Sequence, residues 1–566
     1  MTAYNRRQFL HGASRAFGTG ALLPALNPLS ALAASASSSE PTKIRGVMVD
    51  AARVPETMAY YRRVIEFCAD WQLNTLHFRL TDDQGTALRF ASVPGLVNHE
   101  HAFTPDQLRD LIRFASAHGV DLLPEIESFG HTGFITRSKA YKHLLDDSTE
   151  GSSEFTGVIP VHPETLHLFE KLYREIAAIF PAPYLHGGCD EVNWGGSDLS
   201  QRALRSKSRS QIWAEYLNTL GRTAESLGKQ FIVWGDLVLH KDPTILNGLN
   251  KTTIIMDWNY WDTDAVAFRD ALNTVKAHGA RAIGGPGLIS YRWGARAGVS
   301  QLANIDAFAE AYLQTDNPAS LGVILTNWVP SRYVQNSIWD GFAYAAVAFN
   351  DGPAIARTSA FQRFVERHYR AEWNDAWRQA FQLIYDAAPS FGERAESGLG
   401  LRMPVPWSTD AELKASLQSK TQPPSNPFSR ILELLKTLAP SVRTNEGDFR
   451  AFVLAVEYLD GVFWRESAIR EHASAKSPTQ AESAALIDEI AGRDRKLAVA
   501  LSADWDTGRF PDAPAKTAPL YGNQPKDQLV FQFNRAAAYS AALAQRPARF
   551  FELWQSSGFG AGAHTP

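Results

Sequence analysis

Residues 44–80 read IRGVMVDAARVPETMAYYRRVIEFCADWQLNTLHFRL, and this stretch decides the fold class. It begins with an apolar run at 44–50, continues through an amphipathic stretch at 57–71, and ends in a second apolar run at 73–80. Apolar runs of this length are typical of buried strands, and apolar side chains at helical spacing are typical of a covering helix. The stretch therefore predicts a strand–helix–strand unit with parallel strands.

The same alternation continues as far as residue 328. Eight strands that alternate with helices predict a (β/α)8 barrel, which we assign to residues 40–352. The alternative is a doubly wound open sheet, but no glycine-rich phosphate loop follows the first strand, which argues against it. The further apolar runs lie at 120–126, 184–188, 231–236, 253–259, 281–285 and 323–328, with amphipathic segments such as 105–118, 163–179 and 212–227 between them.

Beyond about residue 350 helical patterns replace the alternation, and we expect an all-helical C-terminal region over 353–566. A proline- and serine-rich break at 421–427 divides it. This region is expected to cover the side of the barrel or to mediate homodimer formation. Its helical segments lie at 355–369, 373–387, 410–418, 431–438, 448–473, 479–501 and 527–544.

The composition is that of a soluble globular protein, with 45% apolar and 20% charged residues. The formal net charge of −4 disfavours a nucleic-acid binder, which normally shows a basic surplus. The chain has only two cysteines, Cys68 and Cys189, so a disulfide framework is excluded. We expect both to be free, buried thiols.

The N-terminal residues resemble a targeting segment rather than part of the fold. The motif Asn5-Arg6-Arg7-Gln8-Phe9-Leu10 is a twin-arginine motif, and a weakly apolar run follows it at 16–32. We expect residues 1–39 to be a bacterial export signal with a flexible lead, and the protein to be periplasmic or secreted. The run is too broken for a comfortable membrane span, so no stable membrane anchor is expected.

Two adjacent carboxylates, Asp190 and Glu191, follow the apolar run at 184–188 and two glycines. Burying such a pair is costly, so a chemical role is expected for it. Other polar and aromatic side chains also follow the predicted strands, where the active sites of barrels form, and together they suggest a sugar-binding cleft. These residues are Asp50, Arg53, Asp82, Asp83, Glu125, Glu127, His131, Trp234, Asp236, Asp257, Trp258, Asn259, Tyr291, Trp293 and Trp328.

Four of these segments carry a family resemblance. The motifs IRGVMVDAAR at 44–53, LHFRLTDDQG at 76–85, LPEIESFGH at 123–131 and HGGCDEV at 186–192 resemble, in the same order, strands one to four of glycoside hydrolase family 20. Members of this family are β-N-acetylhexosaminidases with a barrel fold. The resemblance covers residues 44–350 and is nearest to the hexosaminidase D branch, which lacks the family's N-terminal α/β domain.

The resemblance implies an exo-acting, retaining β-N-acetylhexosaminidase without a cofactor or metal, whose partner is its carbohydrate substrate. The nucleophile is the substrate's own acetamido oxygen, which gives an oxazolinium intermediate. Asp190 would hold the acetamido N–H. Glu191 would act as general acid and base, with a pKa raised by burial and by the charge of Asp190.

The family motifs also imply how the remaining residues act. Arg53 would bind the 3- and 4-hydroxyls of the terminal sugar, and Trp234 and Trp258 would line the acetamido pocket. The remaining positions implied in substrate binding are Asp82, Tyr291 and Trp328. A second set would hold the residues that contact the sugar in position without contacting it themselves: Glu127, His131 and His186.

Three positions depart from the family pattern: Thr86 replaces a Trp, Tyr291-Arg292-Trp293 replaces Tyr-x-Asp, and Trp328-Val329-Pro330 replaces Trp-x-Glu. The preference for gluco or galacto sugars is therefore left open. Two alternatives also stay open: a related barrel that acts on a different or modified amino sugar, and a non-catalytic carbohydrate-binding protein. Scattered histidines such as His99 and His118 show no metal-ligand spacing.

Overall fold

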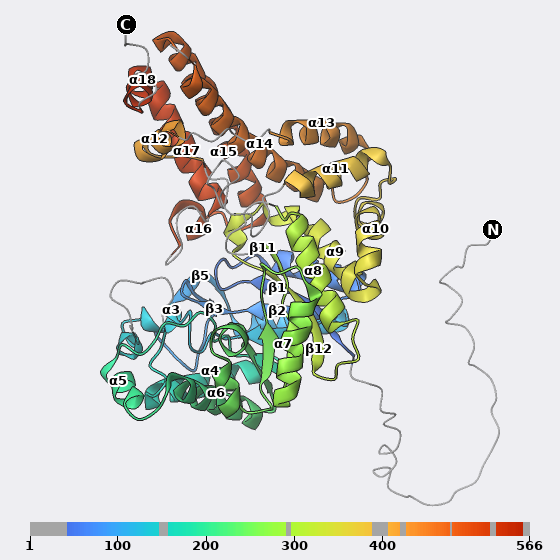
Figure 1. The fold of residues 1–566 in the computed structure, drawn as a ribbon, viewed down its shortest axis with the longest axis vertical. Coiled ribbons are helices and arrows are strands. Elements are labelled where there is room, and N and C mark those ends of the chain that lie inside the picture. The colour runs from blue at the N-terminus through green and yellow to red at the C-terminus, as the bar shows by residue number, and fades with distance from the viewer. Residues whose placement is uncertain are drawn as a thin grey trace, which may run out of the picture. The chain divides into compact units, whose positions relative to one another are not determined.

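The computed structural model describes residues 42–146, 157–289, 296–387, 406–418, 426–475, 478–520 and 528–557. Within these residues eight parallel strands close into a barrel (Figure 1). β1 pairs with β12 as well as with β2, which closes the sheet and excludes the open doubly wound alternative. The predicted barrel is confirmed. Its strands, in order, are β1 (Ile44–Asp50), β2 (Thr75–Arg79), β6 (Asp121–Glu125), β7 (Tyr184–His186), β8 (Gln230–Trp234), β9 (Ile254–Asp257), β10 (Arg281–Gly284) and β12 (Ser320–Asn327).

The register of the first four barrel strands places four polar residues in one row. Asp50 is opposite Arg79, Arg79 is opposite Glu125, and Glu125 is opposite His186. Each is the last residue of its strand, so the row lies at the carboxyl ends, where barrel enzymes carry their active sites.

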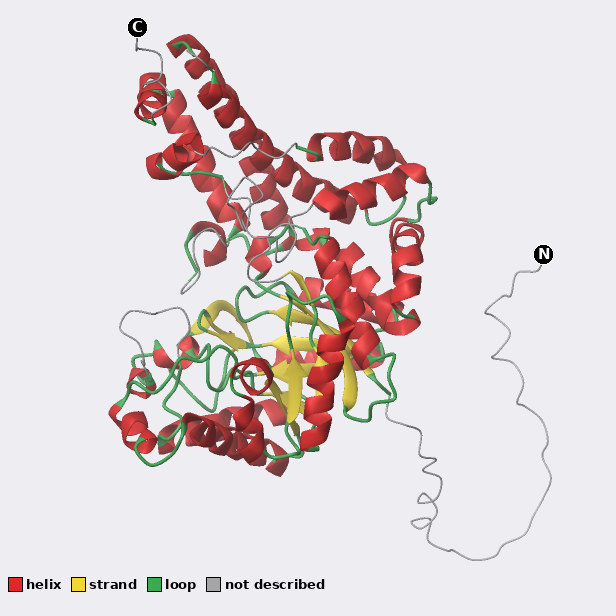
Figure 2. Cartoon of the chain, viewed as in Figure 1, coloured by secondary structure: helices red, strands yellow, loops and turns green. Residues whose placement is uncertain are grey.

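Helices follow the strands around the barrel, as Figure 2 shows in red around the yellow strands. The amphipathic segment at 105–118 corresponds to α2 (Pro105–Ala117), which begins at a reciprocal capping box of Thr104 and Gln107. Between β8 and β9 the covering α-helix is replaced by a π-helical turn, η2 (Asp236–Lys241), and a 3-10 helix, η3 (Pro243–Gly248). The helices around the barrel are α1 (Met58–Asp70), α2 (Pro105–Ala117), α4 (Pro163–Ile179), α6 (Arg209–Ser226), α7 (Ala265–His278), α8 (Val299–Tyr312) and α9 (Trp339–Asp351).

Short elements decorate the carboxyl-end loops of the barrel. After β2 the chain forms a small sheet of β3 (Thr81–Asp82), β4 (Gly85–Leu88) and β5 (Asn98–Phe103). β11 (Gly287–Ile289) pairs with β12. The loops also contain α3 (Gly133–Thr136), η1 (Lys142–Leu144), α5 (Asp198–Leu204), η4 (Pro330–Arg332) and η5 (Gln335–Ser337).

The described secondary-structure elements after the barrel are all helices, as the sequence predicts. The long helices α14, α15 and α17 pack on one another (Figure 1). The domain boundaries at 39/40 and 352/353 stay predictions. The helices are α10 (Pro353–Phe364), η6 (Val365–Tyr369), α11 (Asp375–Ala387), α12 (Asp410–Gln418), α13 (Phe428–Leu438), η7 (Ala439–Ser441), α14 (Glu446–Ser474), α15 (Gln480–Gly508), α16 (Pro514–Thr517), α17 (Leu529–Ala544) and α18 (Pro547–Ser556).

Ion pairs attach this helical region to the barrel. Arg509, just after α15, pairs with Glu56 at 2.9 Å and donates to the carbonyl oxygen of Pro330 at 2.7 Å. Asp448 of α14 pairs with Arg63 at 2.7 Å and with His368 at 2.8 Å. One hydrophobic core extends from the barrel strands into α14 and α17. Loops at the barrel rim are therefore braced by residues more than 400 positions away in the chain, such as Arg509 with Glu56.

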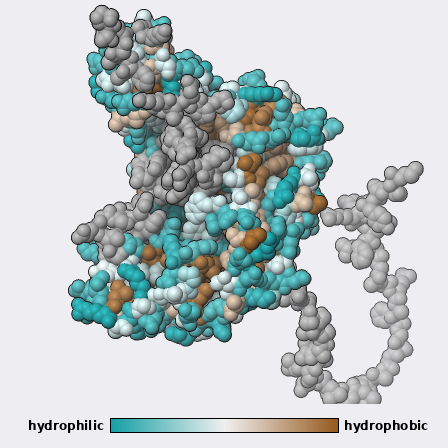
Figure 3. Space-filling model, viewed as in Figure 1, coloured by the Kyte–Doolittle hydropathy of each residue, from teal (hydrophilic) through white to brown (hydrophobic). Residues whose placement is uncertain are grey.

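Among the described helices, none is both long enough and apolar enough to cross a membrane. The face of the molecule seen in Figure 3 is mainly hydrophilic, and its hydrophobic residues form separate small groups. Cys68 and Cys189 are both free and buried, as expected. The proposed export signal at 1–39 lies outside the described residues.

Candidate active site

The turn after β7 has an unusual backbone. Gly188, Cys189 and Glu191 all have positive φ angles, of 64°, 74° and 44°. Residues other than glycine rarely adopt this region, and each instance costs free energy that the surroundings must supply. At Gly188 a Cβ atom would collide with the carboxylate of Glu127, so this position also requires glycine for space. Backbone strain of this kind is concentrated at functional sites.

Three backbone N–H groups of this turn donate to side chains. The N–H of Gly188 donates to His186 Nδ1 at 3.0 Å, and the N–H of Cys189 donates to Glu127 Oε2 at 3.1 Å. The N–H of Glu191 donates to Asp236 Oδ2 at 3.4 Å. Glu127 and His186 therefore contact the turn that carries the carboxylates, in line with the supporting roles that the sequence assigns to them.

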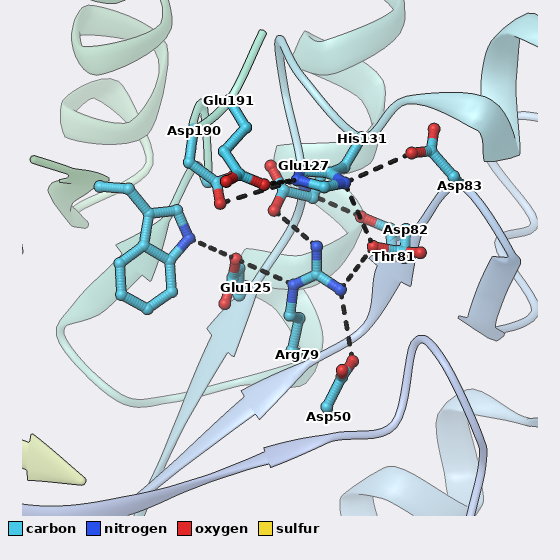
Figure 4. A network of polar contacts seen from close by, with 12 residues as sticks. Asp50, Arg79, Thr81, Asp82, Asp83, Glu125, Glu127, His131, Asp190 and Glu191 are labelled. Carbon is cyan, nitrogen blue, oxygen red and sulfur yellow. Dashed lines mark hydrogen bonds and ion pairs between the residues drawn. The ribbon is translucent and has the colours of Figure 1, made fainter. Parts of the chain in front are cut away.

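Asp190 and Glu191 meet at one nitrogen of His131 (Figure 4). Nε2 of His131 lies 3.7 Å from Asp190 Oδ2 and 3.4 Å from Glu191 Oε2. The side chain of Asp190 is only 8% exposed, whereas that of Glu191 is 35% exposed. Asp190 is thus enclosed in the barrel mouth, and Glu191 presents its carboxylate to the space above it.

The opposite edge of the His131 ring faces a second pair of carboxylates. Nδ1 lies 3.3 Å from Asp83 Oδ2 and 3.6 Å from Asp82 Oδ2. Asp82 in turn pairs with Arg53 at 3.3 Å. The imidazole of His131 therefore bridges the predicted catalytic carboxylates and the predicted sugar-binding Arg53 through Asp82.

Arg79 is the residue of this site to which the sequence pattern assigned no role. Its guanidinium is fully buried and lies 2.8 Å from Asp82, 2.8 Å from Glu127 and 3.3 Å from Asp50. It also lies 3.4 Å from Glu125. An arginine at the end of a buried barrel strand was the available signal, because such a charge must find partners inside the barrel.

The aromatic side chains form the other side of the site. The guanidinium groups of Arg53 and Arg79 each lie 5.2 Å from the ring centroid of Trp328. Trp328 Nε1 donates to the hydroxyl of Tyr260 at 2.7 Å, and Tyr260 is a second residue that the sequence pattern did not single out. Burial raises the pKa of Tyr260, and the charges of Asp190 and Glu191 raise it further, which places this hydroxyl in their field.

The two predicted tryptophan walls differ in burial. Trp234 is 2% exposed, donates from Nε1 to Glu125 Oε1 at 2.9 Å, and packs against Trp328 at 5.6 Å between centroids. Trp258 is half-buried and packs against Tyr260 at 5.1 Å. Tyr291 and Trp293 lie outside the described residues. Thr86, in place of the family's Trp, donates to Asn98 at 2.7 Å.

The pKa values of the two carboxylates are shifted in opposite directions. Burial raises the pKa of Asp190 to about 6, and the charges of Glu191 and Asp236 add to this effect. Burial also acts to raise the pKa of Glu191, but the hydrogen bond and the charge of His131 outweigh it and lower that pKa. The predicted rise in the pKa of Glu191 is therefore wrong for the free site. The prediction weighed burial and the charge of Asp190, but not the positive charge of His131, to which the resemblance gave only a supporting role.

Among Asp190, Glu191 and His131, it is His131 that carries a proton near neutral pH. Burial acts to lower its pKa, but the charge of Asp190 and the hydrogen bonds to Asp83 and Glu191 raise it well above the usual value. Burial raises the pKa of Glu127, and the charge of Asp190 raises it further. The site therefore holds protons near neutral pH immediately beside Asp190 and Glu191.

Three clusters of described residues combine ligand-type atoms closely enough to hold a metal ion: His77–Glu125–His186, Glu100–His101–Asp512 and His131–Asp190–Glu191. In the first, Glu125 lies 2.7 Å from His77, and burial lowers the pKa of His186 to about 3. In the third, the carboxylates already share His131. The expectation that the protein needs no metal or cofactor stays a prediction.

The barrel region matches a known protein family. Residues 43–291 match the family model for the glycosyl hydrolase family 20 catalytic domain. A beta-hexosaminidase from Vibrio furnissii is 26% identical over 251 residues, which are 38% of this chain and 40% of that protein. A beta-hexosaminidase from Akkermansia muciniphila is 29% identical over 209 residues, covering 33% of this chain and 42% of that protein. The chain thus spans less than half the length of either relative.

Among solved structures, this chain is similar to an exo-beta-N-acetylglucosaminidase from Vibrio harveyi in complex with N-acetylglucosamine. The TM-score is 0.42 at 23% identity, over 56% of this chain and 53% of that chain. A chitobiase from Flavobacterium johnsoniae gives a TM-score of 0.45 at 18% identity, over 79% of this chain and 74% of that chain.

Proposed function

Residues 43–291 of this chain belong to glycosyl hydrolase family 20, and on that premise we propose that the protein is an exported, retaining exo-β-N-acetylhexosaminidase. It hydrolyses terminal β-linked N-acetylglucosamine or N-acetylgalactosamine by substrate-assisted catalysis. The similarity to beta-hexosaminidases over the barrel and the geometry around Asp190 and Glu191 support this proposal.

The reaction proceeds in two displacements. The acetamido carbonyl oxygen of the substrate attacks the anomeric carbon to form an oxazolinium ion, while Glu191 protonates the leaving oxygen. Asp190 accepts the acetamido N–H and stabilises the positive charge that develops there. Glu191 then deprotonates a water molecule that opens the oxazolinium ring, so the anomeric configuration is retained.

The observation that carries this proposal is the shared contact on His131. Asp190 and Glu191 gather on one imidazole nitrogen, so their carboxylates lie on one side of the site. In the proposed reaction the two carboxylates act on neighbouring groups of one bound sugar, Asp190 on the acetamido group and Glu191 on the leaving oxygen. Asp190 Oδ1 is also buried and accepts no hydrogen bond from the described residues, which leaves it available to an acetamido N–H.

Because the pKa of Glu191 is lowered in the free site, Glu191 must gain the proton that it later donates to the leaving oxygen. In the free site Glu191 is ionised, and His131 holds a proton 3.4 Å from Glu191 Oε2. A bound sugar covers the exposed part of Glu191, and loss of water raises the pKa of a carboxylate. Substrate binding therefore converts Glu191 into the acid, and His131 is the adjacent proton source.

A substrate panel with the Asp190→Asn variant tests the proposal. We expect release of nitrophenol from nitrophenyl β-N-acetylglucosaminide or β-N-acetylgalactosaminide and far slower release from the plain β-glucoside. Asp190→Asn should lower kcat/KM on the N-acetyl substrates by about 10²–10³-fold, because it removes a charge that stabilises the intermediate. Equal cleavage of the plain glucoside, with Asp190→Asn barely slower on N-acetyl substrates, would rule out substrate assistance. Sugar binding without any turnover would instead indicate a carbohydrate-binding protein.

We also propose that the protein is exported through the twin-arginine route to the periplasm or beyond, on the strength of the motif at Asn5–Leu10. Replacing both Arg6 and Arg7 by Lys should leave the protein in the cytoplasm, as seen by fractionation and immunoblotting. Unchanged export of the double variant would exclude this route. Homodimer formation and placement in the hexosaminidase D branch stay predictions.

A further inference from the structure

Lys241 lies beside the proposed acid, at the end of the π-helical turn η2 that follows β8. Its Nζ lies 3.1 Å from Asp236 Oδ2, and the same oxygen accepts the backbone N–H of Glu191 at 3.4 Å. Burial acts to raise the pKa of Glu191, His131 lowers it, and the positive charge of Lys241 lowers it further. The ammonium of Lys241 is therefore a neighbour of the catalytic turn.

The ion pair of Lys241 and Asp236 has its positive member on the outside. The side chain of Asp236 is 6% exposed, whereas that of Lys241 is 57% exposed. Among the described residues, Asp236 is the only group that contacts Nζ, and an ammonium has three N–H donors. A ligand in the barrel mouth thus meets an ammonium that has donors to spare, above a buried carboxylate.

His240 adds a second cationic side chain to the same turn. Its Nε2 lies 3.2 Å from Asp257 Oδ1, and the side chain of His240 is 39% exposed while that of Asp257 is fully buried. The hydrogen bond to Asp257 raises the pKa of His240 against the effect of burial, and the charge of Asp257 adds to the rise. The next acidic residue, Asp242, accepts instead from Ser210 and from the first turn of η3.

The fold places these cations on the leaving-group side of the site. Arg53 follows β1, whereas η2 follows β8, which is the fourth strand from β1 in either direction around the closed barrel. The two positions therefore face each other across the barrel mouth. In the proposed function Arg53 binds the 3- and 4-hydroxyls, and C1 lies at the opposite end of a pyranose ring from C4. The group released from C1 thus extends toward η2.

We propose that Lys241, with His240 beside it, binds an acidic group on the leaving sugar, so that the preferred substrate is a terminal N-acetylhexosamine β-linked to an acidic sugar. The inference rests on the proposed function and names its substrate class on the leaving side. A carboxylate or sulfate forms a charge-assisted hydrogen bond with an ammonium, which is stronger than one from a neutral hydroxyl. A negative charge near Glu191 also favours the protonated form of that carboxyl group, which is the form that donates to the leaving oxygen.

Three disaccharides test this inference. In each, N-acetylglucosamine is β-1,4-linked to glucuronic acid, to glucose 6-sulfate or to glucose, so the three differ only at C6 of the leaving sugar. We expect kcat/KM on at least one acidic disaccharide to exceed that on the glucose disaccharide by about fivefold or more at low ionic strength. This preference should shrink in about 0.5 M NaCl, because salt screens charges that are exposed to solvent.

The result separates the inference from the proposed function. Without a preference for either acidic sugar the inference fails, while cleavage of nitrophenyl β-N-acetylglucosaminide would still uphold the proposed function. No cleavage of the nitrophenyl substrate or of any disaccharide would overturn both. A preference that persists unchanged in about 0.5 M NaCl would contradict recognition by the exposed ammonium.

Variants of Lys241 separate recognition of the acidic group from the effect of Lys241 on the catalytic turn. Lys241→Met also removes the partner of Asp236, so its activity should fall on every substrate. The ratio of kcat/KM on the acidic disaccharide to that on the glucose disaccharide cancels this shared loss. We expect the ratio to fall to about one in Lys241→Met and to stay at about threefold or more in Lys241→Arg, which keeps the charge.

A matched control is Lys436→Met in α13, because Lys436 is also an exposed lysine, 2.8 Å from the carboxylate of Glu433. This variant should not change the ratio. Melting temperatures of the three variants report whether each is folded. An unchanged ratio in a folded Lys241→Met variant would show that Lys241 does not bind the acidic group.

Discussion

The carboxylate of Glu127 accepts the backbone N–H of Cys189 at 3.1 Å, and its other oxygen lies 2.8 Å from Arg79. Through this one side chain, the buried ion-pair cluster at the strand ends fixes the strained turn that carries Asp190 and Glu191. The orientation of the proposed acid thus depends on residues that lie behind it in the barrel. A position shifted by about 1 Å can cost a catalytic group roughly 10²-fold in rate.

Glu127→Gln tests this link with little change in shape. An amide offers one acceptor, so it can satisfy either the Cys189 N–H or Arg79 but not both. We expect kcat on an N-acetyl substrate to fall by about 10–10²-fold while KM changes little, since Glu127 is fully buried behind the turn. A rise in KM with kcat unchanged would show instead that Glu127 acts on substrate binding.

Gly188→Ala tests the space that the turn requires. The added methyl would collide with the Glu127 carboxylate, at a residue whose φ is 64°. Gly119 is the matched control, because its φ is 70° and no atom of the described residues lies within 4 Å of the place that a Cβ would take. Gly119→Ala should cost roughly 1–2 kcal/mol. We expect Gly188→Ala to lower the melting temperature more than Gly119→Ala and to abolish activity. Equal losses of stability would mean that the contact with Glu127 is not restrictive.

Arg79→Met removes the cation that faces Asp50, Asp82 and Glu127. Buried carboxylates left without their partner are strongly destabilising, so the free energy of unfolding should fall by about 3–5 kcal/mol, measured by urea denaturation. Arg109→Met is the control, because the pair of Arg109 with Asp106 lies on the surface, and its unfolding midpoint should hardly move. A small loss of unfolding free energy in Arg79→Met would show that the buried carboxylates of Asp50, Asp82 and Glu127 do not need this cation for stability.

The acid side of the pH profile depends on Asp190, which must be ionised to stabilise the oxazolinium ion. Since the pKa of Asp190 is about 6, kcat/KM of the wild type should rise with pH through about that value. The positive charge of His131 lowers this pKa, so His131→Asn raises it and moves the acid limb to higher pH. His278→Asn, at a half-buried histidine bonded to the Leu249 carbonyl, should leave the limb in place. An acid limb that stays still or moves to lower pH in His131→Asn would contradict this assignment.

Local patterns were sufficient to predict the barrel. Each of the eight apolar runs corresponds to a barrel strand, because residues buried on both faces leave continuous apolar stretches in the sequence. The amphipathic segment at 105–118 likewise matches α2, whose start depends on local hydrogen bonds between Thr104 and Gln107. The replacement of a helix by η2 and η3 between β8 and β9 was not predicted, because it depends on packing rather than on spacing.

The sequence predicted the site residues that directly follow strands. It was less informative about properties that depend on contacts between residues far apart in the chain. Asp190, Glu191, Arg53 and Asp82 lie together as the motif order implies. The sign of the Glu191 pKa shift depends on His131, which is 60 residues away. The resemblance implied that His131 supports the site, but the effect of its charge on Glu191 depends on the folded geometry. The position of Lys241 beside the catalytic turn depends on η2, so only the folded chain reveals it.

The most direct test of the central claim, that Glu191 is the general acid, compares two leaving groups. N,N′-diacetylchitobiose has a poor leaving group that must be protonated, whereas a dinitrophenyl N-acetylglucosaminide departs without a proton. Glu191→Gln should lower kcat/KM for diacetylchitobiose by at least about 10²-fold and affect bond cleavage in the dinitrophenyl substrate far less. An equal loss on both substrates, or no loss on either, would contradict the assignment of Glu191 as the acid.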